Sequence, residues 1–376
     1  MSLIEPLLTF SGLAWRDALF RPLPDQALGQ HLDAALNWLA QAQDRCEDGG
    51  VSYGYSARGG WLGPYRETTG YIITTWLRAA QALQRPELRE RALRAARWLM
   101  TVQNPDGSFS NPKYGDQGIV FDTGQDLFGL VAAYEVSGDV AFLQAARRAG
   151  RWLVDVADEH RIWTRCEHLN TPHVYNTRTA WALLRLHQID PQADQEAVAR
   201  ANLDWAVANQ QSSGFFTNAA FVQGDAPYTH NISYTICGLQ ESAWILRDTR
   251  YSDAARRCSD AVLALMGDDG FVAGQINAEG QPVARYSCLT GQCQLAIVWA
   301  KQFQLLQDKR YQEASRRSLR YVMRRHVTHH RHPAIAGGVA GSFPVWGRYA
   351  PLSFPNWATK FFVDAALLQR AWGDGA

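Results

Sequence analysis

The sequence lacks an excess of charge, a long apolar run and closely spaced cysteines. Its 37 Lys and Arg balance 36 Asp and Glu, so the net charge of +1 gives no basis for binding nucleic acid or a membrane surface. No apolar stretch approaches the roughly 18 residues of a membrane span. Residues 1–20 contain Glu5, Arg16 and Asp17 and do not have the pattern of a signal peptide. The six cysteines show no CxxC spacing, so we expect a reducing, cytoplasmic location.

Several cofactor and nucleophile motifs are also missing. The glycine-rich "GGVSYGY" has neither the strand–loop–helix context nor the lysine of a phosphate-binding loop, and no G-x-S-x-G is present. The histidines of residues 326–332 have no acidic or cysteine neighbours, which favours a solvated basic loop over a metal site. No cofactor or metal is therefore expected. No Pro- or Ser-rich linker divides the chain, so residues 1–376 are predicted to form one domain.

Two kinds of helical segment repeat along the chain. In "RETTGYIITTWLRAA", "VFDTGQDLFGLVAAY" and "VYNTRTAWALLRLHQ", the threonines Thr69, Thr123 and Thr177 are 54 residues apart twice (123 − 69 and 177 − 123), and three weaker copies follow. A second segment alternates with the first, also six times, and ends in a turn with glycine, as in "RWLMTVQNPDGSF". The unit is therefore a helix, a Gly-rich turn, a second helix and a short link, repeated about every 55 residues.

The polarity of the two segments predicts how they pack. The segments that begin near the threonines are apolar all round, as helices buried on every side are, whereas the others carry Arg and Glu along one stripe. Six buried helices surrounded by six amphipathic ones predict an all-α fold, an (α/α)6 toroid, with residues 63–76, 119–134 and 174–187 among the inner helices. An open superhelix is the weaker alternative, because its repeats are usually shorter and more numerous.

These repeats resemble known families. "VQNPDGSF" is similar to the Q-x-x-D-G-S-W repeat of squalene cyclases, whose domains are α/α toroids. Six inner and six outer helices resemble the six-hairpin glycosidase superfamily, which includes unsaturated uronyl hydrolases, with related toroids among uronate lyases and epimerases. "GGVSYGY", "GGW" and "ETTGY" resemble proteins encoded among bacterial exopolysaccharide genes. The resemblance implies a carbohydrate-active enzyme.

In such a toroid all inner helices begin at one end, so the residues at their starts converge on one cavity. The catalytic candidates at these starts are Glu67, Asp122, Asp126, Tyr175 and His230. The substrate-binding candidates are Tyr65, Arg66, His173, Asn176, Arg178, Asn231, Tyr234, Arg285, Tyr286, Gln292, Trp346, Arg348, Tyr349, Asn356 and Lys360. Rings that stack on sugar faces and side chains that hydrogen-bond suit a carbohydrate.

Some of these residues have a purely structural alternative. Asp122 and the three asparagines Asn176, Asn231 and Asn356 stand where helix N-caps are expected. Glu67 precedes threonines that can cap by themselves, and a carboxylate one turn inside a helix gains nothing from capping, so we interpret Glu67 and Asp126 as functional. His173 and His230, at the starts of the third and fourth inner helices, fit a role as surface histidines equally well.

Four functions remain open from the sequence. Glycoside hydrolysis requires two carboxyl groups, which Glu67 and either Asp122 or Asp126 provide, and we favour it. Elimination or epimerisation of a uronate would use polar residues at the starts of the third and fourth inner helices, namely His173, Tyr175, Asn176, Arg178, His230 and Tyr234. A terpene-cyclase-like or prenyl-transferring enzyme is disfavoured by the polar entrances, and a non-catalytic glycan binder is the fourth reading. The arginines among the candidates suggest an acidic oligosaccharide or polysaccharide as the partner.

Overall fold

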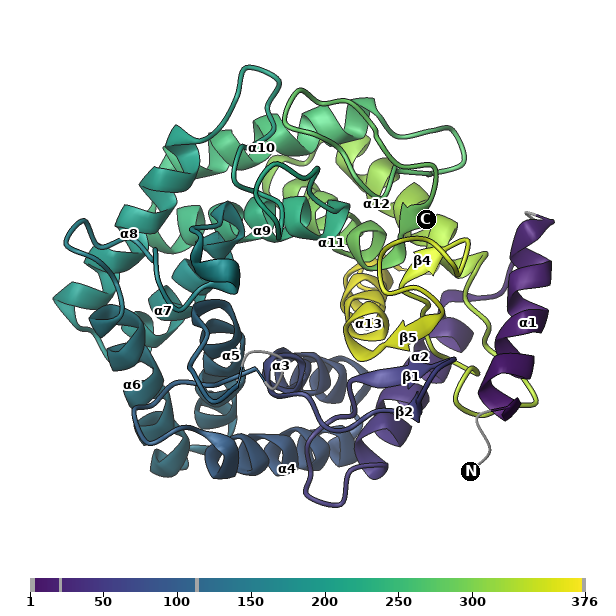
Figure 1. Cartoon of the computed structure of the whole chain (residues 1–376), viewed down its shortest axis with the longest axis horizontal. Coiled ribbons are helices and arrows are strands. Elements are labelled where there is room, and N and C mark those ends of the chain that lie inside the picture. The colour runs from purple at the N-terminus through teal and green to yellow at the C-terminus, as the bar shows by residue number, and fades with distance from the viewer. Residues whose placement is uncertain (1–3, 20–21, 112–114, 374–376) are drawn as a thin grey trace.

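The computed structural model describes residues 4–19, 22–111 and 115–373. Within these ranges thirteen α-helices are present, and twelve of them form two concentric rings (Figure 1). The inner helices are α3 (Arg66–Leu83), α5 (Val120–Ser137), α7 (Thr177–Ile189), α9 (Thr229–Leu246), α11 (Leu289–Leu306) and α13 (Asn356–Arg370). The outer helices are α2 (Leu28–Asp44), α4 (Pro86–Val102), α6 (Val140–Asp155), α8 (Ala193–Ala208), α10 (Thr249–Ala264) and α12 (Lys309–Met323). None of the helices in the described ranges is long and apolar enough to cross a membrane.

The inner ring is closed. Each inner helix contacts the next inner helix along the chain, and α13 contacts α3, which joins the last to the first. Inner helices are buried on nearly all sides, as in α11, where thirteen of eighteen residues are buried. The predicted (α/α)6 toroid is confirmed, and the open superhelix is excluded because the first and last inner helices touch.

The helices pair differently from the predicted unit. Of its two outer-helix neighbours along the chain, each inner helix from α3 to α11 packs more extensively on the one that follows it than on the one that precedes it across the Gly-rich turn. The outer helix α2 has no preceding inner helix in the ring, and it packs on α13 instead. The sixth pair is therefore built from the first and last helices of the ring. Trp38 of α2 strengthens this closure by donating a hydrogen bond from Nε1 to the carbonyl of Ala334 at 2.8 Å.

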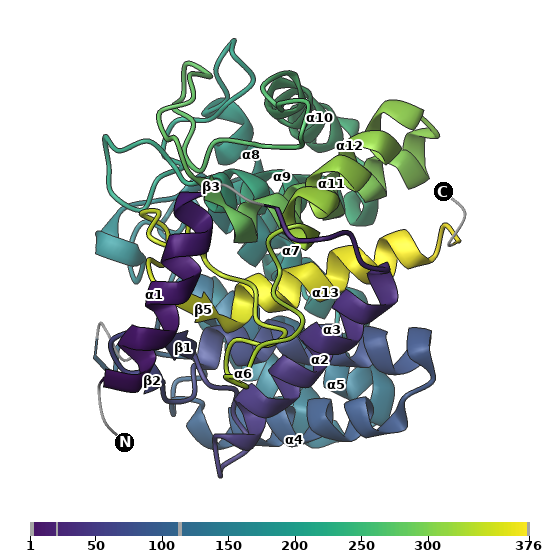
Figure 2. The same cartoon turned by 90° about the vertical axis from the view of Figure 1, so that its right-hand side faces the viewer.

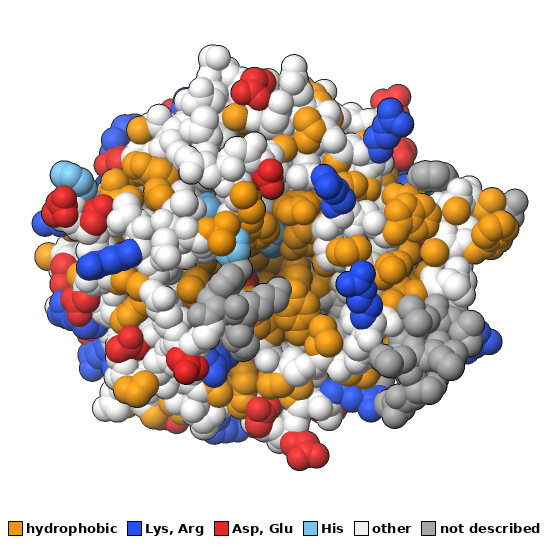
Figure 3. Space-filling model, viewed as in Figure 1, with side chains coloured by type: hydrophobic (Ala, Val, Ile, Leu, Met, Phe, Trp, Pro, Cys, Tyr) orange, Lys and Arg blue, Asp and Glu red, His pale blue; other side chains and the backbone are white. Residues whose placement is uncertain are grey.

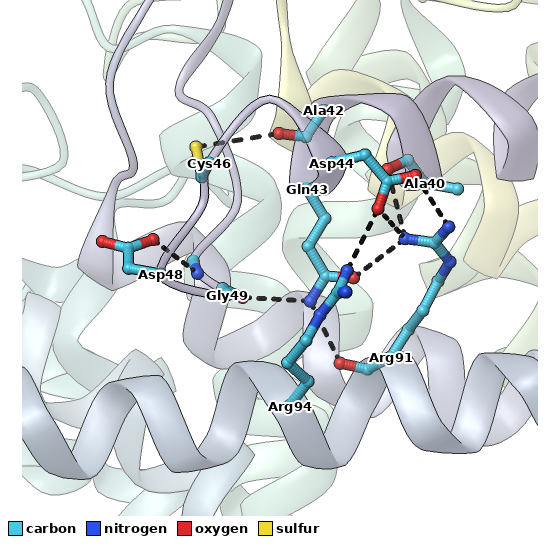
Figure 4. A network of polar contacts seen from close by, with 10 residues as sticks. Ala40, Ala42, Gln43, Asp44, Cys46, Asp48, Gly49, Arg91 and Arg94 are labelled. Carbon is cyan, nitrogen blue, oxygen red and sulfur yellow. Dashed lines mark hydrogen bonds and ion pairs between the residues drawn. The ribbon is translucent and has the colours of Figure 1, made fainter.

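A glutamine at the end of the outer helix α2 ties this helix to the next outer helix, α4 (Figure 4). Gln43 Nε2 donates to the carbonyl of Gly49 in its own turn at 3.0 Å and to the carbonyl of Arg91 in α4 at 3.1 Å. The Arg91 guanidinium also holds the Asp44 carboxylate through two hydrogen bonds of 2.7 and 2.8 Å. This network fixes α2 to α4 at the rim of the toroid.

The same arrangement recurs in other repeats. Gln103 and Gln210 each donate to the glycine carbonyl of their own turn, at 2.9 and 2.8 Å, and to a carbonyl of the next outer helix at 2.9 Å. The repeat aspartate Asp106 accepts a hydrogen bond from the backbone N–H of Ser108 at 3.0 Å. The Gln and Asp of the cyclase-like repeat therefore stabilise turns and contacts between repeats.

In three repeats a threonine fastens the turn to the inner helix that follows, whereas Thr177 donates instead to the Thr235 carbonyl at 3.1 Å. Thr69, Thr123 and Thr359 accept a hydrogen bond at 3.0 or 3.1 Å from the backbone N–H two residues after the turn glycine. Next to the first of them, Gly70 lies so close to α5 that an added Cβ would be 2.5 Å from the Cα of Asp126. Glycine is therefore required where α3 crosses α5.

Short strands and the remaining helix lie at one end of the ring. β1 (Gly54–Ser56) pairs antiparallel with β2 (Gly60–Trp61) and with β5 (Ser353–Pro355), and β3 (Ser287–Cys288) pairs with β4 (Ser342–Phe343). Helix α1 (Ile4–Ala18) runs along the side of the toroid, where Phe10 stacks on Tyr55 with ring centroids 6.1 Å apart (Figure 2). The pairing of β1 with β5 is a second link between the first and last repeats.

Candidate functional site

A cavity of 310 Å³ lies where the inner helices begin. In the view of Figure 3 it is the central hollow, bordered by hydrophobic and histidine side chains. Its lining comes from the starts of four inner helices, from the 3-10 turn before α7 and from the loops between helices. The lining residues are Tyr53, Tyr65, Glu67, Tyr71, Asn111, Ile119, Phe121, Asp122, His168, Tyr175, Phe221, His230, Asn231, Tyr234, Tyr349, Ala350 and Trp357.

Glu67 and Asp122 are joined across the cavity wall by a hydrogen-bonded chain. The Tyr65 hydroxyl donates to Glu67 Oε2 at 2.6 Å. Asn111 Nδ2 donates both to the Tyr65 hydroxyl at 2.7 Å and to Asp122 Oδ2 at 2.9 Å. Burial and the nearby Glu67 and Asp122 carboxylates raise the pKa of Tyr65 well above its ordinary value, so its hydroxyl keeps its proton. The two carboxylates are therefore oriented by uncharged donors.

Asp126, predicted to border the cavity, lies behind its wall. Its side chain is 0% exposed, and among the described residues neither carboxyl oxygen has a hydrogen-bond partner. Burial, with the charges of Asp122 and Glu67, raises the pKa of Asp126 well above its ordinary value. Asp126 packs against Gly70, because a position one turn inside α5 points at the neighbouring helix.

His230 sits on the opposite part of the wall in a fixed tautomer. Its Nδ1 donates to Gln294 Oε1 at 3.0 Å, and its ring lies 4.3 Å from that of Tyr234. Burial lowers the pKa of His230 to about 3, so the ring is neutral and Nε2 carries the lone pair. This histidine is buried, which rules out the surface role considered from the sequence.

Three polar lining residues are buried in the wall. The Tyr71 and Tyr234 hydroxyls interact with each other, whereas among the described residues both amide atoms of Asn231 are buried without a hydrogen-bond partner. Buried polar groups usually find partners, so Asn231 is the exception in this wall.

Aromatic rings form the remaining walls. Trp357 meets Tyr53 edge-on at 4.7 Å and donates from Nε1 to the Tyr349 hydroxyl at 2.8 Å. Phe121 and Tyr175 meet edge-on at 5.3 Å. Such flat, fixed rings provide stacking faces for a sugar.

The arginines and lysine predicted to bind substrate do not line this cavity. Arg66 bonds to the Ser110 carbonyl at 3.2 Å, because its position in the first turn of α3 faces the adjacent loop. Arg178 and Lys360 turn toward the other end of the ring, and Arg285 and Arg348 are exposed on loops. No Lys or Arg of the described residues is part of the lining.

Several uncharged candidates also lie outside the cavity. Tyr286 donates to Gln275 Oε1 at 2.9 Å, Gln292 donates to the Gly270 carbonyl at 2.8 Å, and Trp346 is exposed. His173 is absent from the lining, but its ring stacks on that of Tyr175 at 4.7 Å. These residues hold loops or support the wall from behind.

The capping alternative does not explain the asparagines or Asp122. The N-caps of α5, α7, α9 and α13 make no side-chain capping hydrogen bond. Asn356 instead donates from Nδ2 to the Ser52 carbonyl at 2.8 Å and to Thr68 Oγ1 at 2.7 Å, which ties α13 to the first repeat. Asn176 lies outside the cavity lining, and its Oδ1 accepts from Thr179 Oγ1 at 3.2 Å.

Sequence reasoning missed part of the lining. Tyr53, Asn111, His168 and Phe221 lie in loops that fold over the entrance, and Trp357 is the second residue of α13. The signal for the first two was their place just after the Gly-rich turns, in "GGVSYG" and "DGSFSN".

No cluster of three or more His, Cys, Asp or Glu in the described part of the chain is arranged to hold a metal ion. The predicted solvated character of the histidine run is wrong for His326, which is buried and hydrogen-bonded to His31 through the two Nδ1 atoms at 3.0 Å.

Comparison with known proteins identifies the fold. No family model and no curated protein matches the chain. Among solved structures, it is similar to an unsaturated glucuronyl hydrolase specific for heparin, with TM-score 0.73 and 12% identity over 92% of this chain and 97% of that one. It is also similar to cellobiose 2-epimerase from Bacillus thermoamylovorans, with TM-score 0.69 and 14% identity over 96% of this chain and 99% of that one. A third similar structure is unsaturated glucuronyl hydrolase from Bacillus sp. GL1, with TM-score 0.71 and 15% identity over 90% of this chain and 96% of that one. The chain therefore shares its α/α-toroid fold with these structures, as its repeats predicted.

Proposed function

We propose that this protein is a glycan-active enzyme that hydrolyses a short, uronate-containing oligosaccharide. The observation that carries the proposal is the pair of carboxylates, Glu67 and Asp122, held on one cavity wall by Tyr65 and Asn111. The similar structures include glucuronyl hydrolases and a sugar epimerase, which supports a carbohydrate substrate.

The proposed reaction uses the two carboxyl groups in turn. One, as the acid, protonates the glycosidic oxygen while the bond from that oxygen to the sugar carbon breaks. A water oxygen then bonds to the sugar carbon, and the other carboxylate takes a proton from that water. The products are two sugars, and a proton exchange with solvent restores the pair. Tyr65 and Asn111 position the carboxylates and take no proton themselves.

Cavity size and lining define the substrate. At 310 Å³ the cavity is at the low end of the roughly 300–1,000 Å³ of small-molecule sites, so it suits the end of an oligosaccharide better than a continuous polymer. A uronate here would be held by uncharged polar residues of the lining, such as Asn231, together with the partial positive charge of the converging helix N-termini.

Epimerisation or elimination is the second candidate, because His230 presents an unprotonated Nε2 at the cavity wall. Its low pKa makes it a weak base, which is why we place hydrolysis first. An origin in exopolysaccharide metabolism and a cytoplasmic location stay predictions.

The test replaces each carboxylate by its amide. We expect Glu67→Gln and Asp122→Asn to lower turnover of a uronate-terminated oligosaccharide by about 100-fold or more while binding measured by calorimetry persists. Glu159→Gln, an exposed carboxylate away from the cavity, is the matched control and should keep full activity. Unchanged turnover in both amide variants would refute the hydrolytic assignment.

Two further outcomes refine the proposal. A preference for a neutral terminal sugar over the uronate would overturn the substrate class and leave the hydrolytic pair intact. Loss of activity in His230→Ala or Tyr175→Phe, with Glu67→Gln and Asp122→Asn active, would replace hydrolysis by elimination or epimerisation.

A further inference from the structure

A second cavity of 280 Å³ lies at the other end of the toroid. Its lining comes from all six inner helices, and it shares no residue with the lining of the first cavity. Helix α13 spans the two ends, running from the side of β5 to the side of the C-terminus (Figure 2). The second cavity is therefore separate from the candidate active site.

Arg178 gives this cavity an unbalanced buried charge. The side chain is 4% exposed, and its Nε donates to Gln125 Oε1 at 2.6 Å. Among the described residues no carboxylate forms an ion pair with it. Its guanidinium lies 5.0 to 5.7 Å from the centres of five aromatic rings, the nearest that of Tyr234. Burying a charge without a counter-ion is costly, and ring faces compensate for only part of that cost.

Three more cations face the same space. Lys360 Nζ lies 2.7 Å from Asp364 Oδ2, Arg78 lies 3.6 Å from Asp364 Oδ1, and Lys301 is bonded to Glu241. With Arg178, four cations are thus opposed by two carboxylates, which leaves two positive charges in excess. Burial lowers the pKa of Lys360 to about 8, so this ammonium is largely protonated at neutral pH.

The cations form a path from solvent to the cavity floor. The Arg78 side chain at the mouth is 53% exposed, Lys301 is 24% exposed, and Lys360 at the floor is 2% exposed. A charged path with apolar walls attracts ions of the opposite sign. The lining residues that contribute apolar walls are Ala82, Phe128, Trp181, Ile297, Phe361, Leu367, Leu368 and Ala371.

We propose that this second cavity binds an organic monocarboxylate with a hydrocarbon body. The carboxylate would contact Arg178 and Lys360, and the body would lie along the wall formed by Phe361 and its apolar neighbours. An inorganic anion would leave the apolar side chains of the cavity in contact with water. An uncharged hydrocarbon would leave the Arg178 charge unpaired. The occupant would also lie directly beneath the candidate active site, because Gln294 lines this cavity and binds His230 of the other.

The test is calorimetric binding to the whole protein, with octanoate and 4-phenylbutyrate as alkyl and aryl probes. Octanamide and 4-phenylbutyramide are their uncharged counterparts. We expect at least one acid to bind, and its amide to bind at least tenfold more weakly. Absence of binding by both acids, or equal binding of acid and amide, would overturn the proposal.

Variants locate the site. Arg178→Gln should weaken acid binding at least tenfold, and Arg250→Gln, an exposed arginine far along the outer ring, should leave it unchanged. If Arg178→Gln does not fold, acid binding is measured in Ala82→Phe instead and should be weakened. Ala82 is exposed at the mouth of the cavity, so a larger side chain there obstructs entry without altering any charge. Wild-type affinity in Ala82→Phe or in folded Arg178→Gln would place the probe elsewhere and refute this assignment.

Discussion

Replacing Gly70 by alanine tests the tight crossing of two inner helices. A Cβ at this position would lie 2.5 Å from the Cα of Asp126 and 2.7 Å from the carbonyl oxygen of Gln125, both closer than the 3.0 Å that real Cβ atoms respect. The obstruction is backbone on a buried helix, so no side-chain rotation relieves it. Overpacking of a core costs about 1–3 kcal/mol, and a rigid backbone neighbour places Gly70→Ala near the upper value, about 3 kcal/mol.

The assay is urea denaturation followed by tryptophan fluorescence, with Gly29→Ala as the control. Gly29 lies in the first turn of α2 with nothing within 4 Å of its added Cβ, so this change should stabilise the protein by up to about 1 kcal/mol. Because Gly70 is three residues from Glu67, turnover should also fall in Gly70→Ala. A free energy of unfolding within 1 kcal/mol of wild type would refute the close crossing of α3 and α5.

Three further measurements follow from the structure. Burial lowers the pKa of His230 and of His326 to about 3. Below pH 6.5 these histidines therefore bind protons in the unfolded chain but not in the folded one, so the free energy of unfolding decreases as the pH is lowered. Wild type should lose about 2 kcal/mol more than His326→Gln between pH 7 and pH 5, and equal losses would contradict neutral burial. Thr123→Val removes the acceptor of the Phe109 N–H and should cost about 1–3 kcal/mol, whereas Thr123→Ser retains it; equal stability would show that the bond is dispensable. If residues 1–376 form one domain, fluorescence and circular dichroism should report one coincident unfolding transition, and two separated transitions would disprove it.

The fold could be predicted from the sequence because each repeat carries strong local signals. The glycine that ends an outer helix and the all-round apolar inner helix recur along the chain, and Thr69 and Thr123, which receive the turn N–H, are 54 residues apart (123 − 69). The pairing of neighbours follows the lengths of the connections. Two or three residues join an inner helix to the outer helix that follows it, as between α3 and α4, whereas 17 to 32 residues separate it from the outer helix that precedes it. The pairing of α2 with α13 could not be predicted in this way, because these helices lie at opposite ends of the chain segment that forms the ring.

The site was predictable only where its residues begin inner helices. Glu67 and Asp122 occupy first turns and line the cavity, whereas Asp126 is one turn farther and faces a neighbouring helix. Arg178 was predicted as a substrate-binding residue because it follows the start of an inner helix. Its direction, toward the far end of the ring, depends on packing that spacing does not encode.

The pairing of α2 with α13 means that the first ring helix to be synthesised waits for the last one. From Asp44 to Asn356 is 312 residues, which at about 5–20 residues per second takes a ribosome about 15 to 60 s. During that time Leu32, Leu36 and Leu39 of α2, which are buried in the finished ring, have no final partner. The nascent protein is therefore an open arc that exposes apolar side chains of α2, and its central cavity is completed only when α13 leaves the ribosome and closes the ring.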